Sequence, residues 1–361
     1  MARTIALVGG GTMGPTAPLL ALYKNLKKRH PHDAFVWAGT NEGPERGPIT
    51  ALGIPFVAIP TAKFSRHFSA ALLKLPFSYW YARQAAKAFL SQWKPDIIIG
   101  TGGFTQVPIM CTAWRLGIPC VIHQLDFSPT LSNRLVARFC KLITTTFVYH
   151  YRKFNVRVEE MHIATPNRFA GLEVPERARA AQYFGLTTDR PIVFVVGGGT
   201  GARALNEALE KDLKRWLEKI QIIHSTGRGR SGQVASRTGY ARFEFLDEEQ
   251  MLYAYAAADV VISRAGMGSI TDLSALNKAS VLVPIPNSHQ EKNARHIPRG
   301  AVEVDQGPGF ADDLYRAVVK LLIHREDRVR LASELRRDIK TDDGSEWASL
   351  IERLLPEEFD I

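Results

Sequence analysis

Short apolar runs alternate with amphipathic stretches from the start of the chain to its end. The runs are rich in β-branched residues and lack polar alternation, as is typical of strands covered on both faces. Strands that alternate with helical stretches predict parallel sheets with helices on both sides, an α/β fold class. In the first half, the expected strands are Ile5–Val8, Ala34–Ala38, Pro55–Ile59, Ile97–Gly100, Cys120–His123 and Leu142–Thr146. In the second half, they are Ile192–Val196, Gln221–His224, Arg242–Phe245, Val260–Ser263, Ser280–Val283 and Val302–Val304.

This pattern divides the chain into two similar halves. Each half has about six expected strands, enough for a complete doubly wound sheet. Each also opens with a strand, a glycine turn and a helix, IALVGGGTMGP and IVFVVGGGTGA. We therefore expect two Rossmann-like doubly wound domains, residues 1–165 and 166–340, whose strand carboxyl ends face a shared cleft. Residues 341–361 contain a last helical stretch, which we expect to pack back on the first domain.

The segment Pro191–Asn206 carries the clearest chemical signal. A buried strand leads into a glycine-rich turn, and a helix begins near Ala202. The free N–H groups and the positive dipole end of such a helix can hold a diphosphate. The pattern also fits a tight strand-to-helix turn that binds nothing, so the segment alone leaves both interpretations open. The glycines of the turn are Gly197, Gly198, Gly199 and Gly201.

Composition narrows the range of partners. The 361 residues carry a formal net charge of +10, which favours an anionic partner such as a phosphorylated ligand or an acidic membrane surface. Zinc-finger spacing and RNA-binding aromatic motifs are absent from the sequence, so we expect no nucleic-acid partner. Three cysteines without a CxxC pair are typical of a reducing compartment. With no signal-peptide pattern and no run long enough to span a bilayer, we expect a cytosolic protein or one attached to the cytosolic membrane face.

Several ordered motifs cover almost the whole chain: GGTMGPTAP from Gly10, GTGGFTQVP from Gly100, LGIPCVIHQLD from Leu116, TPNR from Thr165, VVGGGTGARALN from Val195, EFLDE from Glu244, ADVVISRAGMGSITDL from Ala258 and PNSHQEKNA from Pro286. In this order and spacing they resemble the MurG family of bacterial N-acetylglucosaminyltransferases, which have the two-domain GT-B fold. The resemblance implies an inverting transfer of GlcNAc from UDP-GlcNAc to undecaprenyl-diphosphate-MurNAc-pentapeptide, the step from lipid I to lipid II. It also implies a part in peptidoglycan synthesis, cell wall biogenesis, cell shape and cell division.

The resemblance places the UDP-sugar donor on the second domain. Asp272 stands at the position of a family glutamate that holds the ribose hydroxyls, and Arg168 matches an arginine that faces the diphosphate. Leu246 matches the place where backbone groups meet uracil, and Gln290 matches a glutamine that contacts the donor sugar. We expect Arg168 and the helix dipole to stabilise the leaving diphosphate without a metal or another cofactor. The remaining expected donor residues are Gly198, Gly199, Thr200, Gly201, Gly266 and Met267.

The acceptor half departs from the family pattern. Pro15 occupies the position of the histidine proposed to act near the acceptor, and the family HEQN segment reads HQLD here. Our hypothesis is that Asp126 is the general base and that His123 orients it or the acceptor. A structural role for His123 and helix capping by Asp126 are the alternatives. The expected acceptor-side glycine loops contain Gly11, Thr12, Gly14 and Gly103.

The segment from Phe64 to Trp80 mixes apolar and basic residues. An apolar patch ringed by positive charge suits an anionic membrane surface that carries a polyprenyl-diphosphate-linked acceptor. An ordinary helix packed on the sheet is the alternative. The expected membrane residues are Leu72, Leu73, Leu75, Phe77 and Trp80.

Three other functions remain open at this point. A UDP-sugar transferase with another acceptor would explain why the departures collect in the first domain. A non-catalytic nucleotide-sugar-binding partner at the membrane would explain the missing histidine. A dinucleotide oxidoreductase shares the Rossmann-like turns, but Ile223-His224-Ser225 stands where an acidic residue for the NAD ribose is expected, so we do not favour it.

Overall fold

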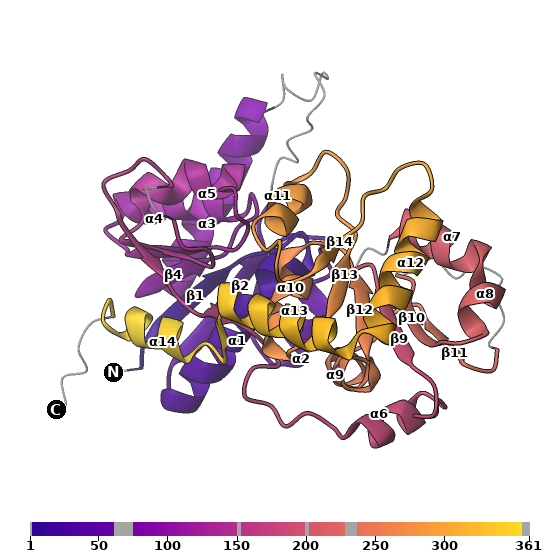
Figure 1. The fold of residues 1–361 in the computed structure, drawn as a ribbon. Coiled ribbons are helices and arrows are strands. Elements are labelled where there is room, and N and C mark those ends of the chain that lie inside the picture. Colours follow the sequence, from indigo (N-terminus) through magenta and orange to yellow (C-terminus); the bar gives the residue numbers. More distant parts are fainter. Residues whose placement is uncertain (1, 61–74, 150–152, 199–201, 228–236, 356–361) are drawn as a thin grey trace. The chain divides into compact units, whose positions relative to one another are not determined.

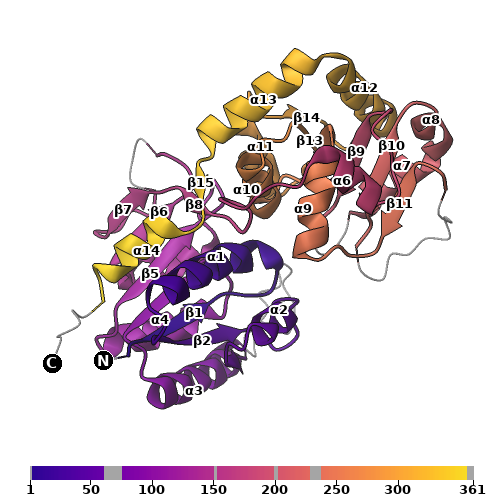
Figure 2. The same ribbon diagram turned by 90° about the horizontal axis from the view of Figure 1, so that it is seen from below.

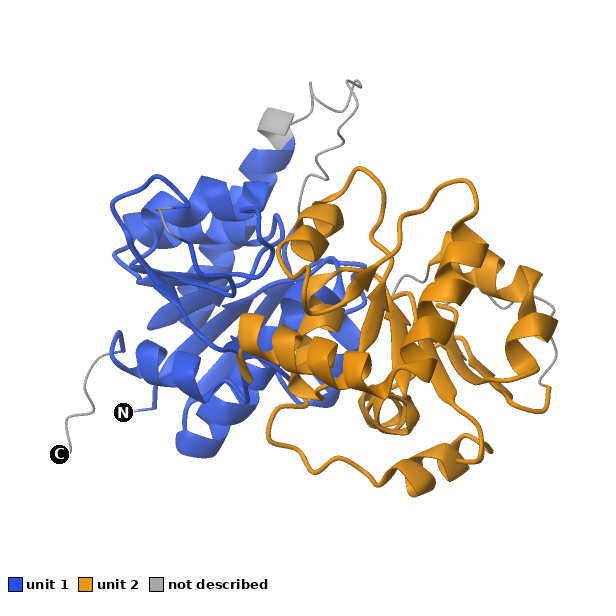
Figure 3. Ribbon diagram, in the orientation of Figure 1, with its two compact units in different colours: residues 1–168, 342–361 blue, residues 169–341 orange. Residues whose placement is uncertain are grey.

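The computed structural model describes residues 2–60, 75–149, 153–198, 202–227 and 237–355 (Figure 1). The chain forms two compact units (Figure 3). Unit 1 contains Met1–Arg168 together with Asp342–Ile361, and unit 2 contains Phe169–Thr341. Each unit is an α/β body built on a parallel sheet, so the predicted fold class is confirmed.

Unit 1 contains a seven-stranded sheet in the order β3-β2-β1-β4-β5-β6-β7. Neighbouring strands are parallel throughout. The order reverses between β1 and β4, which is the switch point where ligands bind in open parallel sheets. The strands are β1 (Thr4–Val8), β2 (Ala34–Gly39), β3 (Phe56–Ala58), β4 (Ile97–Gly100), β5 (Cys120–Gln124), β6 (Leu142–Thr145) and β7 (Glu159–His162).

Successive residues of a strand point to opposite faces, so each strand contributes to two cores. On β1, Ile5 and Leu7 enter one buried cluster, whereas Ala6 and Val8 enter the other. The first cluster lies under α1 and α14, and the second lies under α3, α4 and α5. The helices of the unit are α1 (Met13–Arg29), α2 (Arg46–Ala51), α3 (Leu75–Trp93), α4 (Gln106–Arg115), α5 (Leu131–Val136) and α14 (Ser345–Glu352).

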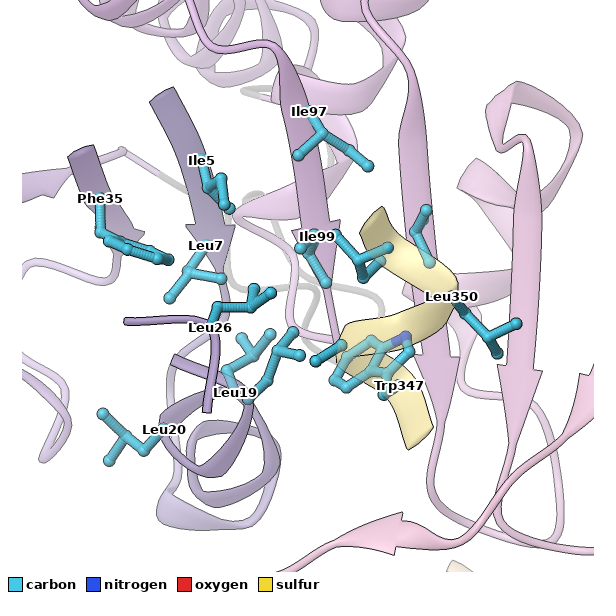
Figure 4. Packing of buried hydrophobic residues seen from close by; sticks show 14 of the residues in the cluster. Ile5, Leu7, Leu19, Leu20, Leu26, Phe35, Ile97, Ile99, Trp347 and Leu350 are labelled. Carbon is cyan, nitrogen blue, oxygen red and sulfur yellow. The ribbon is translucent and has the colours of Figure 1, made fainter. Parts of the chain in front are cut away.

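The C-terminal helix α14 is part of the unit 1 core. It packs against α1, as Figure 2 also shows. The indole of Trp347 is fully buried and lies with Leu19 and Ile99 in one hydrophobic cluster (Figure 4). Just before this helix, the short strand β15 (Thr341–Asp342) pairs with β8 (Thr165–Pro166).

Unit 2 repeats the same topology with a six-stranded sheet in the order β11-β10-β9-β12-β13-β14. Its switch point therefore lies between β9 and β12. The strands are β9 (Ile192–Val196), β10 (Gln221–Ser225), β11 (Tyr240–Phe243), β12 (Val260–Ser263), β13 (Ser280–Leu282) and β14 (Val302–Glu303). The helices are α6 (Arg177–Tyr183), α7 (Arg203–Lys211), α8 (Leu213–Leu217), α9 (Glu248–Ala257), α10 (Met267–Ala275), α11 (His289–Arg295), α12 (Phe310–Ile323) and α13 (Arg325–Asp338).

The strand predictions missed three strands, β7, β8 and β15, and misplaced β11, while the other strand ends differ by at most one residue. Strand β7, EEMH, was not predicted because it lies at the edge of the sheet and its polar residues carry no apolar run. Strand β11 begins at Tyr240 and ends at Phe243, two residues earlier than expected at each end. The apolar pair Phe245-Leu246, counted partly into the strand, belongs to the loop that follows it.

Candidate functional site

At the carboxyl edge of the unit 2 sheet, strand β9 ends in the predicted phosphate turn. All residues of β9, Ile192–Val196, are buried, so the turn begins at a strand that is held in the core. Gly198 has a φ of +83°, a conformation that requires glycine. Gly199, Thr200 and Gly201 lie outside the described residues, and α7 begins just beyond them at Arg203. A helix start after a glycine turn is suited to an anion.

A second loop at the same edge follows β12 and begins with Arg264. The side chain of Arg264 is 8% exposed, and Nη1 donates to the carbonyls of Val283 at 3.0 Å and Pro284 at 3.4 Å. Burial lowers the pKa of this guanidinium. Asn293 Nδ2 donates to the carbonyl of Ala265 at 3.2 Å. These bonds tie the loop after β12 to the loop after β13.

Gln290 and Gly266, both predicted donor residues, lie together at this edge. Gln290 Oε1 accepts a hydrogen bond from the N–H of Ile285 at 3.1 Å. A Cβ atom added at Gly266 would lie 3.6 Å from Gln290 Nε2. Asn293 is fully buried, and its amide bonds the backbone of the neighbouring loop.

The other predicted donor residues occupy different settings. Asp272 and Met267 are buried on α10, for which Gly266 is the N-cap residue. Leu246 is buried in the loop after β11, directly before Asp247, which caps α9 through a capping box with Gln250. Half-buried Arg168 ends the first of the two segments that make up unit 1, just after strand β8. Their ligand contacts stay predictions.

In unit 1, the first glycine loop is built around Glu45, which the sequence analysis did not single out. The Glu45 carboxylate is fully buried and accepts hydrogen bonds from the Gly11 N–H at 3.2 Å and the Thr40 N–H at 2.9 Å. The Thr40 hydroxyl also donates to it, at 2.5 Å. A Cβ atom at Gly10 would lie 2.2 Å from Glu45 Oε1, so the loop and the carboxylate fit only without a side chain there.

The loop after β4 packs against this first loop at the switch point. A Cβ atom at Gly103, whose φ is +89°, would lie 3.0 Å from the carbonyl oxygen of Gly10. The Thr101 hydroxyl donates to the carbonyl of Pro15. Pro15 itself is in the first turn of α1, where a missing N–H costs no helix bond. The two predicted acceptor-side loops, with Gly11 and Gly103, therefore lie side by side at the carboxyl edge of the unit 1 sheet.

His123 lies in the core of unit 1. Its ring is fully buried: Nδ1 lies 3.0 Å from the Thr144 hydroxyl and Nε2 lies 3.1 Å from the Thr146 hydroxyl. The ring also packs on Trp347, with 5.1 Å between centroids. Burial lowers the pKa of His123 to about 3. Both nitrogens are bonded to threonines inside the unit, which favours the structural role for His123, and its part in orienting Asp126 or the acceptor stays a prediction.

Asp126 lies at the predicted edge, half-buried in the loop after β5. It does not cap the next helix: the Thr130 hydroxyl accepts the N–H of Asn133 and is the N-cap of α5. The neighbouring residues form an aromatic group that the sequence analysis missed. Phe127 and Tyr149 have ring centroids 5.6 Å apart, and Lys153 Nζ lies 4.2 Å from the Phe127 ring centre. Sequence spacing gave no signal for this group, because its members come from separate loops.

The predicted membrane segment is only partly described. Leu72 and Leu73 lie outside the described residues, and Leu75 and Phe77 fall in the first turn of α3, where side chains are not described. Trp80 is 53% exposed on α3, as are its neighbours Tyr79 and Tyr81 at 45% and 63%. No helix among the described residues is long and apolar enough to cross a membrane.

The described residues lack a cluster of three or more possible metal ligands, that is, of histidine, cysteine, aspartate or glutamate side chains. The three cysteines are free thiols, and burial raises the pKa of Cys120 to about 12. Such thiols are protonated and poor ligands.

Comparison with known proteins identifies the class. The glycosyltransferase family 28 N-terminal domain matches residues 5–145, and the family 28 C-terminal domain matches residues 192–305. The chain thus belongs to glycosyltransferase family 28, and within that family it belongs with the MurG proteins.

The relatives are similar over most of their length. A UDP-N-acetylglucosamine--N-acetylmuramyl-(pentapeptide) pyrophosphoryl-undecaprenol N-acetylglucosamine transferase of Nocardioides sp. is 36% identical over 85% of this chain and 83% of its own. A protein of the same name from Legionella pneumophila is 32% identical over 94% of this chain and 93% of its own. The crystal structure of Acinetobacter baumannii MurG matches the fold with a TM-score of 0.72 at 24% identity, covering 98% of this chain and 100% of that one.

Proposed function

We propose that the protein transfers GlcNAc from UDP-GlcNAc to the MurNAc sugar of an undecaprenyl-pyrophosphoryl-MurNAc-pentapeptide. The observation that carries the proposal is the similarity of both units, together and in order, to transferases named for this reaction, at 36% and 32% identity. The chain contributes two sheets whose glycine turns lie at their switch points, where sugar nucleotides and phosphates bind.

Unit 2 holds the donor in this proposal. The turn at Gly198 and the start of α7 receive the diphosphate, and the Asp272 carboxylate accepts hydrogen bonds from the ribose diol. Backbone groups beside Leu246 meet uracil, and Gln290 contacts the sugar. Met267 and Gly266 shape the wall of the donor site, since they form the start of α10 beside Gln290.

The reaction is a single displacement at the anomeric carbon. A hydroxyl of the acceptor sugar attacks this carbon and loses its proton to the Asp126 carboxylate, while the bond to the UDP oxygen breaks and UDP leaves with the electron pair. The Arg168 guanidinium and the N-terminal end of α7 stabilise the charge on the departing diphosphate. Asp126 is suited to the role of base because it follows β5 at the carboxyl edge and is half-buried rather than enclosed.

The acceptor is lipid-linked, and we propose that α3 and α4 hold the protein on the anionic membrane surface. Exposed aromatic and apolar residues gather on these two helices, which pack together. They include Trp80 at 53%, Trp114 at 54% and Leu116 at 61% exposure. Arg83 and Arg115 on the same helices supply positive charge for acidic headgroups. The protein would then act at the cytoplasmic face of the membrane as a peripheral protein.

Flotation with liposomes that contain an anionic lipid tests the membrane proposal. A Trp80→Ser variant should float less than wild type, because it removes an interfacial aromatic side chain. Ile323, 70% exposed on α12 of unit 2, offers the control Ile323→Ser, which should float as wild type. Equal flotation of all three proteins, or none by wild type, would contradict the proposed surface.

The transfer itself is tested with labelled UDP-GlcNAc and a lipid I analogue in detergent. Wild type should form product, Asp126→Asn should lose turnover while it still binds UDP, and Asp272→Ala should lose UDP binding. An Asp126→Asn variant with wild-type turnover would remove the proposed base. UDP binding without any product would indicate another acceptor or a non-catalytic role, which the departure at Pro15 would then explain.

A further inference from the structure

Three buried carboxamides in unit 1 form one chain of hydrogen bonds. Gln106 on α4, Asn133 on α5 and Gln124 on β5 are each 0% exposed. Gln106 Nε2 donates to Asn133 Oδ1 at 2.6 Å, and Asn133 Nδ2 donates to Gln124 Oε1 at 2.7 Å. All the donors in this chain point the same way, an arrangement in which each bond polarises the next.

The two ends of this row of hydrogen bonds are the glycine turn after β4 and the loop after β5. At one end, the backbone N–H of Gly102 donates to Gln106 Oε1 at 3.1 Å. At the other end, Gln124 Nε2 donates to the carbonyls of Asp126 at 2.7 Å and Ser128 at 3.1 Å. The chain therefore connects the glycine turn after β4 with the loop that carries Asp126.

Gln124 is saturated in this arrangement. Besides its two donated bonds, its Oε1 accepts from Asn133 Nδ2 and from the Thr130 N–H at 3.4 Å. A carboxamide has two donor hydrogens and two acceptor lone pairs, and all four are used. A carboxylate here would place negative charge against the carbonyl oxygens of Asp126 and Ser128, with no hydrogen to share.

We propose that Gln106, Asn133 and Gln124 are positioning residues for the acceptor: their amide chain fixes the Asp126 loop against the Gly102–Gly103 turn. In this chain, where Gln124 replaces the glutamate of the family HEQN segment and Asp126 replaces its asparagine, transfer requires a hydrogen-bond donor at position 124. Its catalytic consequence rests on the proposed function, whereas the coupling of the two loops does not. The hydrogen bonds also explain why residue 124 is a glutamine, since the carboxylate of a glutamate cannot donate the two bonds to backbone carbonyls.

Gln124→Glu is the sharpest test, because it keeps size and shape and removes the donors. Hydrogen exchange in the free protein is expected to be faster in the peptide containing residues 101–106, at the far end of the chain, as well as around residue 126. In the transfer assay, kcat/KM for the acceptor is expected to fall by on the order of 10-fold or more, with UDP affinity unchanged.

The pH profile separates positioning from general damage to the fold. A buried carboxyl group has a raised pKa, and its protonated form regains one O–H donor. Activity of Gln124→Glu relative to wild type is therefore expected to recover as the pH is lowered. Gln124→Met, which has no donor at any pH, should show no such recovery. If Gln124→Glu does not fold, Asn133→Asp breaks the chain at the next bond and takes its place.

Gln221 in unit 2 provides a matched control. It is a buried glutamine that accepts from the Thr187 N–H at 3.1 Å and donates to the Thr187 carbonyl at 2.7 Å. Gln221→Glu should leave exchange at residues 101–106 and the acceptor KM as in wild type. Unchanged exchange at residues 101–106 in folded Gln124→Glu would overturn the coupling. Wild-type transfer kinetics in the same variant would overturn the catalytic requirement. If the wild-type protein shows no transfer, this would count against the proposed function. Hydrogen exchange at residues 101–106 would still decide whether the two loops are coupled.

Discussion

His123 and Asp126 are three positions apart in the chain, yet their side chains lie in different surroundings. The ring of His123 is enclosed by Thr144, Thr146 and Trp347, whereas Asp126 lies half-buried beyond the strand end. In a strand, one residue can be fixed in the core while the residues just past its end reach the edge. Closeness in sequence to the proposed base therefore does not by itself place a histidine at the edge of the sheet.

This burial predicts that the His123 ring does not titrate near neutral pH. Because burial lowers its pKa to about 3, the ring stays neutral from about pH 5 to 8. In NMR spectra of ¹³C-labelled protein, its Cε1 signal should be constant from about pH 5 to 8, below and above the ordinary histidine pKa. A His123 signal that moves with a midpoint near 6.5 would contradict the buried assignment.

Glu45 is the second residue whose role is visible only in the fold. Replacing it by glutamine puts an NH₂ group among the N–H groups of Gly11 and Thr40, all of them donors. We expect Glu45→Gln to lower the free energy of unfolding by about 1–3 kcal/mol, the cost of an unsatisfied buried group. Urea denaturation measures this change. Exposed Glu42 offers the control Glu42→Gln, which should be within about 0.5 kcal/mol of wild type. Equal stability of the two variants would show that the carboxylate is dispensable.

At the scale of elements, the periodicity of apolar residues predicted the buried strands. It missed the polar edge strand β7 and the buried polar side chains, whose positions depend on contacts with distant parts of the sequence. Buried strands such as Ile97–Gly100 were found because every residue is apolar. Strand β7 was missed because its EEMH sequence has no apolar run, and its position beside β6 is fixed by pairing. The glycine turns were predicted from local sequence. Glu45, Gln106 and Asn133 were not, because a buried polar side chain is recognised only by its partners.

The C-terminal helix α14 makes a testable contribution as an element. Trp347 is fully buried among Leu19, Ile99 and other residues of the unit 1 core, although it comes from the end of the sequence. We expect Trp347→Ala to destabilise unit 1 by about 3–5 kcal/mol through lost burial and the cavity left behind. Trp80, 53% exposed on α3, offers the control Trp80→Ala, which should change stability by less than about 1 kcal/mol. Urea denaturation followed by circular dichroism compares the two, and similar losses would contradict the packing role.

At the scale of the whole molecule, each unit has one fully buried histidine among its described residues. In unit 2, His224 Nδ1 lies 2.8 Å from the Tyr240 hydroxyl and Nε2 lies 3.0 Å from Asn206 Oδ1. Burial lowers the pKa of His224 to about 3, as it does for His123 in unit 1. Both units therefore share the same sensitivity to acid.

The sign of this sensitivity follows from proton linkage. The ordinary histidine pKa is 6.5, and the folded-state pKa of both rings is about 3. Between these two pH values, the unfolded chain binds protons at positions 123 and 224, whereas the folded units do not. The stability that the two neutral rings contribute is fully present above pH 6.5 and is lost as the pH falls toward 3, by up to ~1.4 kcal/mol per pH unit for each histidine. Urea denaturation at pH 7.5, 5.5 and 4.5 should show this loss. His224→Gln should be less stable at pH 7.5 but lose less on acidification, because one titrating group is gone. An equal loss in wild type and in this variant would show that other groups set the acid sensitivity.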